Sequence, residues 1–96
     1  MRTHLTVWIV AYDIRDDARL RKVHKTVRGY GDPLQYSVYR CVISGLQLAQ
    51  LKDKLTRVID AHDDQVLFVP LGSADAERTW QHWTLGQPIA PSERVV

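Results

Sequence analysis

An almost wholly apolar run, LTVWIVAY from Leu5 to Tyr12, constrains the fold of this chain more than any other stretch. Its β-branched and aromatic residues do not alternate with charged ones, which is typical of a central β-strand covered on both faces. The run ends abruptly at Asp13, and a segment rich in basic residues follows. The sequence therefore predicts a buried strand that carries a carboxylate to the edge of a sheet, next to a basic helix.

The length and composition fit one compact, soluble domain. The chain has 96 residues, which is close to the common size of a domain. The apolar run is too short to span a bilayer and lacks the organisation of a signal peptide. The only cysteine, Cys41, excludes an internal disulfide framework and suits a reducing compartment. We therefore expect a cytoplasmic protein with no membrane partner.

The segment after Asp13 predicts a helix. Asp16 or Asp17 can cap its first turn, because a carboxylate accepts the free N–H groups at a helix N-terminus. Glycines at positions 29 and 31 predict its end. Apolar residues at three- and four-residue steps form one stripe on this helix: Leu20, Val23, Val27 and Tyr30.

The middle of the chain predicts a strand or a hairpin, a second helix and another strand. Residues 34–43 alternate imperfectly, so they fit either one long strand or a tight hairpin. Ser44 and Gln47 have the spacing of a capping box. Asp63 and Asp64 then turn the chain into a strand over residues 66–71. The stripe expected to be buried on the second helix comprises Leu48, Leu51, Leu55, Val58 and His62.

The C-terminal extension, residues 73–96, predicts two short strands, from Thr79 to Leu85 and from Glu93 to Val96. The order of elements favours an α+β plait with two helices packed on one face of a sheet. The other face needs a cover, and a second copy of the chain is the simplest one. We therefore expect a homodimer.

Asp13 has two interpretations that its position leaves open. A carboxylate at the end of a buried strand commonly accepts hydrogen bonds from loop amides. Alternatively it is a metal ligand, since Mg²⁺ is usually held by one or two carboxylates with waters and substrate phosphates. One aspartate per chain is a poor site, but a nearby two-fold axis would supply a pair. Asp16 and Asp17 fit a cap and the surface better than ligands.

The first helix carries a row of positive charge. Residues 1–30 hold seven Lys and Arg against three Asp, and residues 31–96 hold six against eight. Arg21, Lys25 and Arg28 lie almost opposite the apolar stripe, with Arg19 and Lys22 beside them. A solvated face is one interpretation. The other is a surface for a phosphate backbone, because no acidic residue is interleaved from position 18 to 28.

Other chemistries find little support in the sequence. The histidines at positions 4, 24, 62 and 82 lack the spacing of zinc ligands, and no Gly-rich phosphate loop is present. Ser37 has no sequence context of a nucleophile. Trp80 and Trp83 could stack on bases, but their spacing near a chain end favours packing or an interface.

Two stretches resemble the CRISPR-associated protein 2 family, the small subunit of the machinery that acquires new spacers. They are YDIRDDARLRKVHKTVRGYG, which begins at Tyr12, and LQYSVYRCVI, which begins at Leu34. The resemblance includes a Tyr-Asp pair that ends the first strand, a basic helix, a Tyr-Gly stop and a Gln-x-Ser-Val-aromatic motif. It continues through VLFVPLG and covers roughly residues 5–72.

The resemblance implies a single ferredoxin-like βαββαβ domain over residues 1–96, whose C-terminal strand pairs across a homodimer. It implies one Mg²⁺ per dimer between the two Asp13 side chains, with Tyr12 as a second catalytic residue and Ser37 and Tyr39 near the site. The expected nucleic-acid-binding residues are Arg19, Arg21 and Lys22 by resemblance, and Lys25 and Arg28 from the basic row. Some members carry a basic residue where this chain has Pro33.

Three functions remain open at this point. The first is a Mg²⁺-dependent endonuclease that cleaves RNA or double-stranded DNA. The second is a dimeric adaptor that holds duplex DNA, bridges copies of the CRISPR-associated integrase, and is not itself catalytic. The third is a toxin-type ribonuclease of related fold. One carboxylate and a basic face suit all three, and the adaptor role rests on the resemblance.

Overall fold

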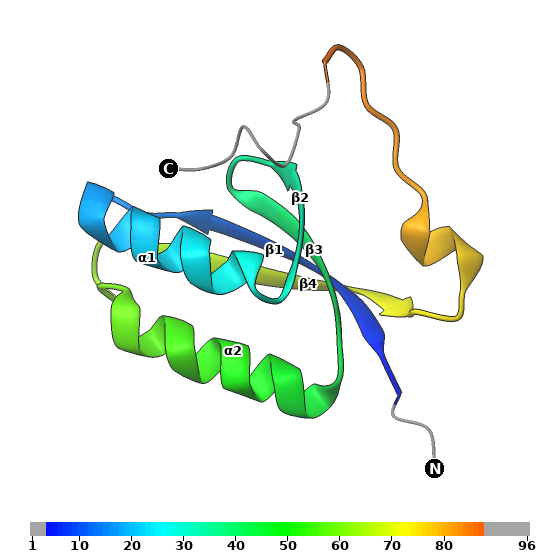
Figure 1. Ribbon diagram of the computed structural model, residues 1–96, viewed down its shortest axis with the longest axis horizontal. Coiled ribbons are helices and arrows are strands. Elements are labelled where there is room, and N and C mark those ends of the chain that lie inside the picture. The colour runs from blue at the N-terminus through cyan, green and yellow to red at the C-terminus, as the bar shows by residue number, and fades with distance from the viewer. Residues whose placement is uncertain (1–3, 88–96) are drawn as a thin grey trace.

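The computed structural model describes residues 4–87, which form a four-stranded sheet, two α-helices and a short 3₁₀ helix (Figure 1). In chain order the elements are β1 (Thr6–Asp13), α1 (Asp17–Arg28), β2 (Gly31–Gln35), β3 (Val38–Ile43), α2 (Gly45–Val58), β4 (Gln65–Ser73) and η1 (Glu77–Trp80). No helix in residues 4–87 is long and apolar enough to cross a membrane.

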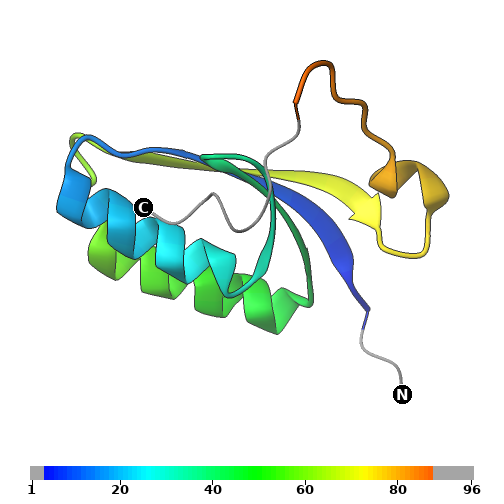
Figure 2. The ribbon, with the colours of Figure 1, turned by 45° about the horizontal axis from the view of Figure 1, so that its top comes forward.

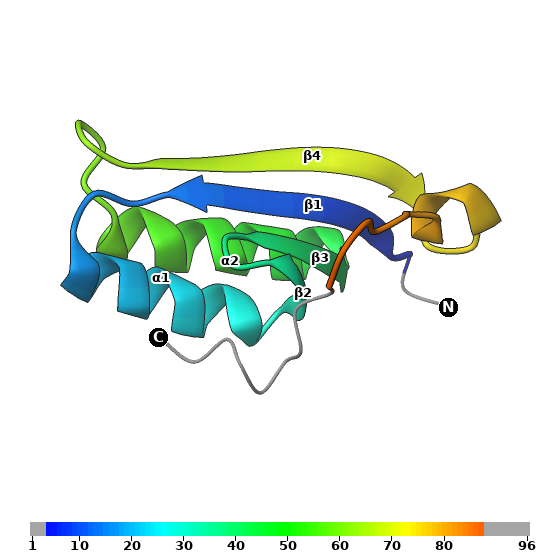
Figure 3. The same ribbon diagram turned by 90° about the horizontal axis from the view of Figure 1, so that it is seen from above.

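The sheet has the strand order β2-β3-β1-β4, and all its pairings are antiparallel. Both helices lie on the same face of the sheet, as the tilted view and the view from above show (Figures 2 and 3). This is the α+β plait that the order of elements predicted, with the ferredoxin-like arrangement that the resemblance implied. The predicted central strand is confirmed, since β1 pairs with β3 on one side and β4 on the other.

The core lies between the sheet and the two helices. Alternate side chains of β1 and β3 point toward the helices, while α1 and α2 contribute the apolar stripes that close the layer. The prediction that β1 is covered on both faces is only partly correct, because Ile9 and Ala11 are half-buried. The buried core residues are Val10, Tyr12, Val23, Val27, Tyr39, Cys41, Ile43, Leu51 and Leu55.

Both helices begin at the predicted caps. The Asp16 side chain accepts a hydrogen bond from the Arg19 backbone N–H, and Ser44 and Gln47 form the reciprocal bonds of a capping box. The prediction that His62 completes the buried stripe of the second helix is wrong. Helix α2 ends at Val58, and His62 is exposed in the next turn, where its backbone N–H donates to the Asp60 carboxylate.

Residues 34–43 belong to a hairpin rather than to one strand. Strands β2 and β3 pair with a register shift between Pro33 and Gln35, and Tyr36 and Ser37 form the turn. Pro33 has no backbone N–H, and it lies in β2, which is an edge strand, where a proline is tolerated.

The prediction of a strand from Thr79 to Leu85 is wrong. The Thr79 hydroxyl donates to the carbonyls of Ser73 and Ala76, at 3.0 and 2.7 Å. These bonds close a tight turn that contains η1, and residues 81–87 follow without pairing to the sheet. The strand predicted over residues 93–96 lies outside the described residues.

The sheet face opposite the helices, hereafter the bare face, is largely apolar. One row across it joins Val38, Ala11 and Leu67, and the next joins Arg40, Ile9 and Val69. Leu67 and Val69 are 50% and 38% exposed. In these rows, Arg40 is the only charged residue among apolar neighbours. Its guanidinium lies 5.7 Å from the centroid of the Trp80 ring, and its Nη2 lies 2.6 Å from His82 Nδ1.

Candidate functional site

Asp13 is the last residue of β1, and its carboxylate is exposed. Its side chain retains 64% of its accessible surface, and among residues 4–87 its one ion pair is with Arg15, at 3.4 Å between Asp13 Oδ2 and Arg15 Nη2. Arg15 is itself 68% exposed, and ion pairs between two exposed side chains contribute little to stability. The Asp13 carboxylate is therefore accessible to a ligand.

A cavity of about 350 Å³ adjoins Asp13. It brings together three residues that the sequence placed in or near the site: Tyr12, Asp13 and Ser37. The rest of its lining is formed by Ile14, Leu20, His24 and Tyr36. The turn between β2 and β3 therefore lies beside the end of β1, although the two are more than 20 residues apart in sequence.

Tyr12 and Tyr39 lie deeper than Asp13. Tyr12 is 6% exposed and Tyr39 is fully buried, and their rings stack with centroids 6.4 Å apart. The Tyr12 hydroxyl lies 3.0 Å from His24 Nδ1, and it donates to the Tyr36 carbonyl at 3.2 Å. His24 is 3% exposed. From the sequence it is considered only as a possible zinc ligand, although its spacing, four residues after Leu20 and three before Val27, is a signal of its burial.

The basic residues of α1 divide into two groups. Arg21, Lys22, Lys25 and Arg28 are exposed, and none of them forms an ion pair with another described residue. Arg19 differs, because its guanidinium is bound within the chain. Nε lies 2.7 Å and Nη2 3.1 Å from the two carboxylate oxygens of Asp64.

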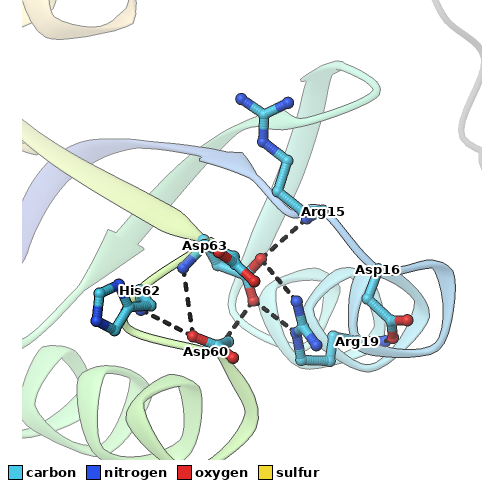
Figure 4. A network of polar contacts seen from close by, with 7 residues as sticks. Arg15, Asp16, Arg19, Asp60, His62 and Asp63 are labelled. Carbon is cyan, nitrogen blue, oxygen red and sulfur yellow. Dashed lines mark hydrogen bonds and ion pairs between the residues drawn. The ribbon is translucent and has the colours of Figure 1, made fainter.

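Asp64 is the centre of a polar network that the sequence analysis missed. Figure 4 draws this network and labels its partners Arg15, Arg19 and Asp60. Besides Arg19, its carboxylate accepts hydrogen bonds from the backbone N–H groups of Arg15 and Asp60, at 2.9 and 2.8 Å. Its side chain has no exposed surface. The hydrogen bond from Arg19, reinforced by these backbone donors, holds the pKa of Asp64 well below its usual range. The same hydrogen bond raises the pKa of Arg19.

The network joins the loop after β1 to the turn before β4. In the first of these segments, Asp16 caps α1 by accepting from the Arg19 backbone. In the second, the Asp60 carboxylate accepts from the backbone of His62 and Asp63 (Figure 4). The only signal of this network in the sequence was that Asp64 precedes a predicted strand, which places it at the same end of the sheet as Asp13. The arginine that binds it is 45 residues away.

Among residues 4–87 there is no group of three or more His, Cys, Asp or Glu side chains that could hold a metal ion. An exposed carboxylate oxygen is nevertheless the ligand that Mg²⁺ prefers. Asp13 therefore fits Mg²⁺ as one ligand, with the others supplied by a second chain, water or a substrate phosphate.

An antiparallel sheet in the order β2-β3-β1-β4, covered on one face by two helices, defines a small ferredoxin-like protein. A model of the family described as CRISPR associated protein Cas2 matches residues 6–79. The chain belongs to this family, and the resemblance seen in the sequence is confirmed.

Individual relatives support the assignment. The chain is 41% identical over 68 residues to a CRISPR-associated endoribonuclease Cas2 of Rhodospirillum rubrum, covering 71% of this chain and 67% of that protein. It is 36% identical over 70 residues to a CRISPR-associated endonuclease Cas2 of Halalkalibacterium halodurans, covering 68% and 73%. The crystal structure of Streptococcus pyogenes Cas2 is similar with a TM-score of 0.71 and 32% identity, over 83% of this chain and 99% of that one.

Proposed function

We propose that this chain is a homodimeric CRISPR adaptation protein that holds duplex DNA on the basic face of α1 and bridges copies of the integrase subunit. The observation that carries the proposal is the row of four exposed cations on α1, which have no acidic partner among the described residues. A surface of this kind attracts a phosphate backbone regardless of base sequence.

The second helix provides a contrast within the same molecule. On α2 the exposed Arg57 is paired with Asp53 one turn earlier, at 3.1 Å. Such an i,i+4 pair is typical of a solvated helix face. The four exposed cations of α1 lack such a partner among residues 4–87, which favours an anionic partner over a solvated face.

The bare face supports the homodimer. Leu67, Val69 and Leu71 of β4 are 50%, 38% and 39% exposed, and they adjoin the apolar rows of β1 and β3. In the tail, Trp83 and Leu85 are 86% and 98% exposed. A second copy would cover this apolar surface, and a C-terminal strand that pairs with the partner would bury the tail.

A second candidate function is a Mg²⁺-dependent endonuclease at Asp13, favoured by the exposure of this carboxylate beside a cavity. The relatives described above are named endonuclease or endoribonuclease. Two Asp13 side chains, one from each copy, would hold the ion. When bound, Mg²⁺ activates water and neutralises the charge that develops on the phosphate during hydrolysis of RNA or double-stranded DNA.

The basic row is tested by the salt dependence of duplex binding. In the triple variant Arg21→Ala, Lys25→Ala and Arg28→Ala, we expect the slope of log K against log salt to flatten by roughly one unit for each charge. Arg57→Ala is the matched control, because it removes an exposed but paired arginine from the other helix. Equal slopes in the triple variant and the wild type would show that the basic row is a solvated helix face that does not contact phosphates.

The assembly is tested by light scattering and by binding to the integrase. We expect twice the chain mass of 11.1 kDa at micromolar concentrations, and a weaker dimer after removal of residues 93–96. A monomer throughout this range would contradict the homodimer. Failure of the wild type to bind the integrase would contradict the adaptor, and a toxin-like gene neighbourhood would favour the ribonuclease alternative.

A further inference from the structure

His24 is a buried polar residue beneath the candidate site. It projects from α1, is 3% exposed, and lines the same cavity as Asp13. Its ring meets the Tyr39 ring edge-on, with centroids 5.8 Å apart. Burying an imidazole is costly unless its nitrogens are hydrogen-bonded, and an apolar side chain would fill this place in the stripe without that cost. The presence of a histidine at this buried position is therefore not explained by packing alone.

Three contacts around His24 form a directed chain. A carbonyl can only accept, so in the arrangement that uses every contact the Tyr12 hydroxyl donates to the Tyr36 carbonyl and accepts from His24 Nδ1, which lies 3.0 Å away. In the neutral ring Nε2 is then an acceptor, and the Tyr39 hydroxyl lies 3.5 Å from it. One tautomer of His24 thus satisfies all three contacts, and the contact with Tyr12 is shorter than the contact with Tyr39.

This series of hydrogen bonds leads from His24 to Tyr12, the residue next to Asp13 in the candidate site. Tyr12 is bonded covalently to Asp13, and its backbone N–H donates to the Ser37 carbonyl at 3.0 Å. Its hydroxyl binds the carbonyl of Tyr36, the other residue of the same turn. Backbone and side chain of one tyrosine therefore fix the turn between β2 and β3 against the end of β1, and His24 holds the hydroxyl of that tyrosine from α1.

We propose that His24 is a positioning residue for Asp13, and that it acts through its hydrogen bond to Tyr12. It orients the end of β1 and the Tyr36–Ser37 turn, so that the Asp13 carboxylate and the turn face one cavity. Outer residues that orient a metal ligand typically change metal affinity by 10–100-fold when they are removed. The expected effect of His24 on metal affinity at Asp13 rests on the proposed function. Its expected effect on the structure of the β1 end and the Tyr36–Ser37 turn does not.

The first test is amide hydrogen exchange, which needs no metal. In His24→Phe and in Tyr12→Phe we expect the Tyr12 amide to exchange roughly tenfold faster relative to the Val10 amide in the same strand. Tyr39→Phe is the matched control, since it removes a hydroxyl from the other nitrogen of the same ring. There we expect the ratio to stay within about threefold of the wild type.

A purely structural role for His24 would speed exchange at Tyr12 and Val10 together, so an unchanged ratio in the His24 and Tyr12 variants would overturn the proposal. Tyr12→Phe keeps the shape of the core and still gives a decision if His24→Phe does not fold. His24→Asn carries a side-chain N–H close to the position of Nδ1, and we expect it to restore most of the protection.

The second test follows Mn²⁺, used alone as a paramagnetic probe, by the broadening of the Asp13 amide signal. We expect roughly tenfold weaker binding in His24→Phe and in Tyr12→Phe, and no loss in the double variant beyond that of Tyr12→Phe, because Tyr12→Phe already lacks the hydrogen bond through which His24 acts. Additive losses would overturn the proposal. If Mn²⁺ does not bind the wild type at Asp13, the proposed metal site fails, and the exchange ratios alone decide the role of His24.

Discussion

Asp13 and Asp64 lie at the same end of the sheet, and their surroundings are opposite. Asp13 pairs across the sheet with Gln65, the residue that follows Asp64. The Asp13 side chain is 64% exposed and has one long ion pair. The Asp64 side chain has no exposed surface and accepts four hydrogen bonds. A carboxylate whose acceptors are all used holds the protein together, whereas one with unused acceptors can take a ligand.

The largest effect is expected from Asp13→Asn. The substitution keeps the size of the side chain and removes its charge. If the wild type is a metal-dependent nuclease, we expect its cleavage to fall by at least ~100-fold while Tm is unchanged. Cleavage and thermal unfolding are measured on the same preparation. Equal cleavage by both proteins would indicate a contaminating nuclease, and a large fall in Tm would mean that Asp13 resembles Asp64 more than its exposure suggests. Binding to duplex and integrase should survive.

The reverse pattern is expected from Asp64→Asn. It leaves the Arg19 guanidinium without its charged partner and removes acceptors from the Arg15 and Asp60 amides, so we expect Tm to fall by roughly 10 °C. Asp60→Asn is a suitable comparison, because Asp60 accepts only in an exposed turn. A Tm for Asp64→Asn within about 2 °C of the wild type would remove the distinction between the two carboxylates.

Acid titration sharpens the same distinction. The pKa of Asp64 is lowered chiefly by Arg19, so the unfolded chain takes up this proton at a higher pH than the folded chain does. The stabilisation is fully present above the unfolded pKa of about 3.9 and is lost as the pH falls toward the folded value. We therefore expect the Tm difference between wild type and Asp64→Asn to be constant above about pH 5 and to shrink below about pH 4. A difference that grows in acid would contradict this assignment.

The smallest effect is expected from Asp53→Asn. The pair of Asp53 and Arg57 is exposed at both ends, with side chains 61% and 77% accessible. Such a pair contributes about 0.3–0.5 kcal/mol, so Tm should fall by no more than about 4 °C. Measured at low and high salt, this small difference should disappear as the charges are screened.

The sequence was sufficient for the elements whose signals are local. The Asp16 cap, the Ser44–Gln47 box and the apolar run of β1 depend on residues a few positions apart, and all are confirmed. The apolar periodicity of the second helix wrongly included His62. It could not show that the Asp60 carboxylate accepts hydrogen bonds from the backbone N–H groups of His62 and Asp63 in the turn that follows the helix.

The candidate site was only partly predictable. The strand-end position of Asp13 left open whether its carboxylate binds loop amides or a ligand, and only the structure shows that it is exposed. The imperfect alternation around Tyr39 did not show that this residue is buried. The partner of Arg19 could not be predicted from the sequence. Asp64 is 45 residues from Arg19, and the sequence contains several other aspartates that could have paired with it. The same limit hid His24, whose two tyrosine contacts come from strands 12 and 15 residues away.

The two edges of the sheet differ in their capacity for polymer growth. Strand β2 has Pro33 at its centre and a register shift beside it, and both features prevent a further strand from docking along that edge. Strand β4, at the opposite edge, offers a proline-free run over residues 65–69. A fibril needs two receptive edges on every unit. If two copies of this chain pair through their β4 edges, each has only its β2 edge left, and that edge does not accept another strand. Pairing through β4 would therefore give a closed dimer instead of an open-ended filament.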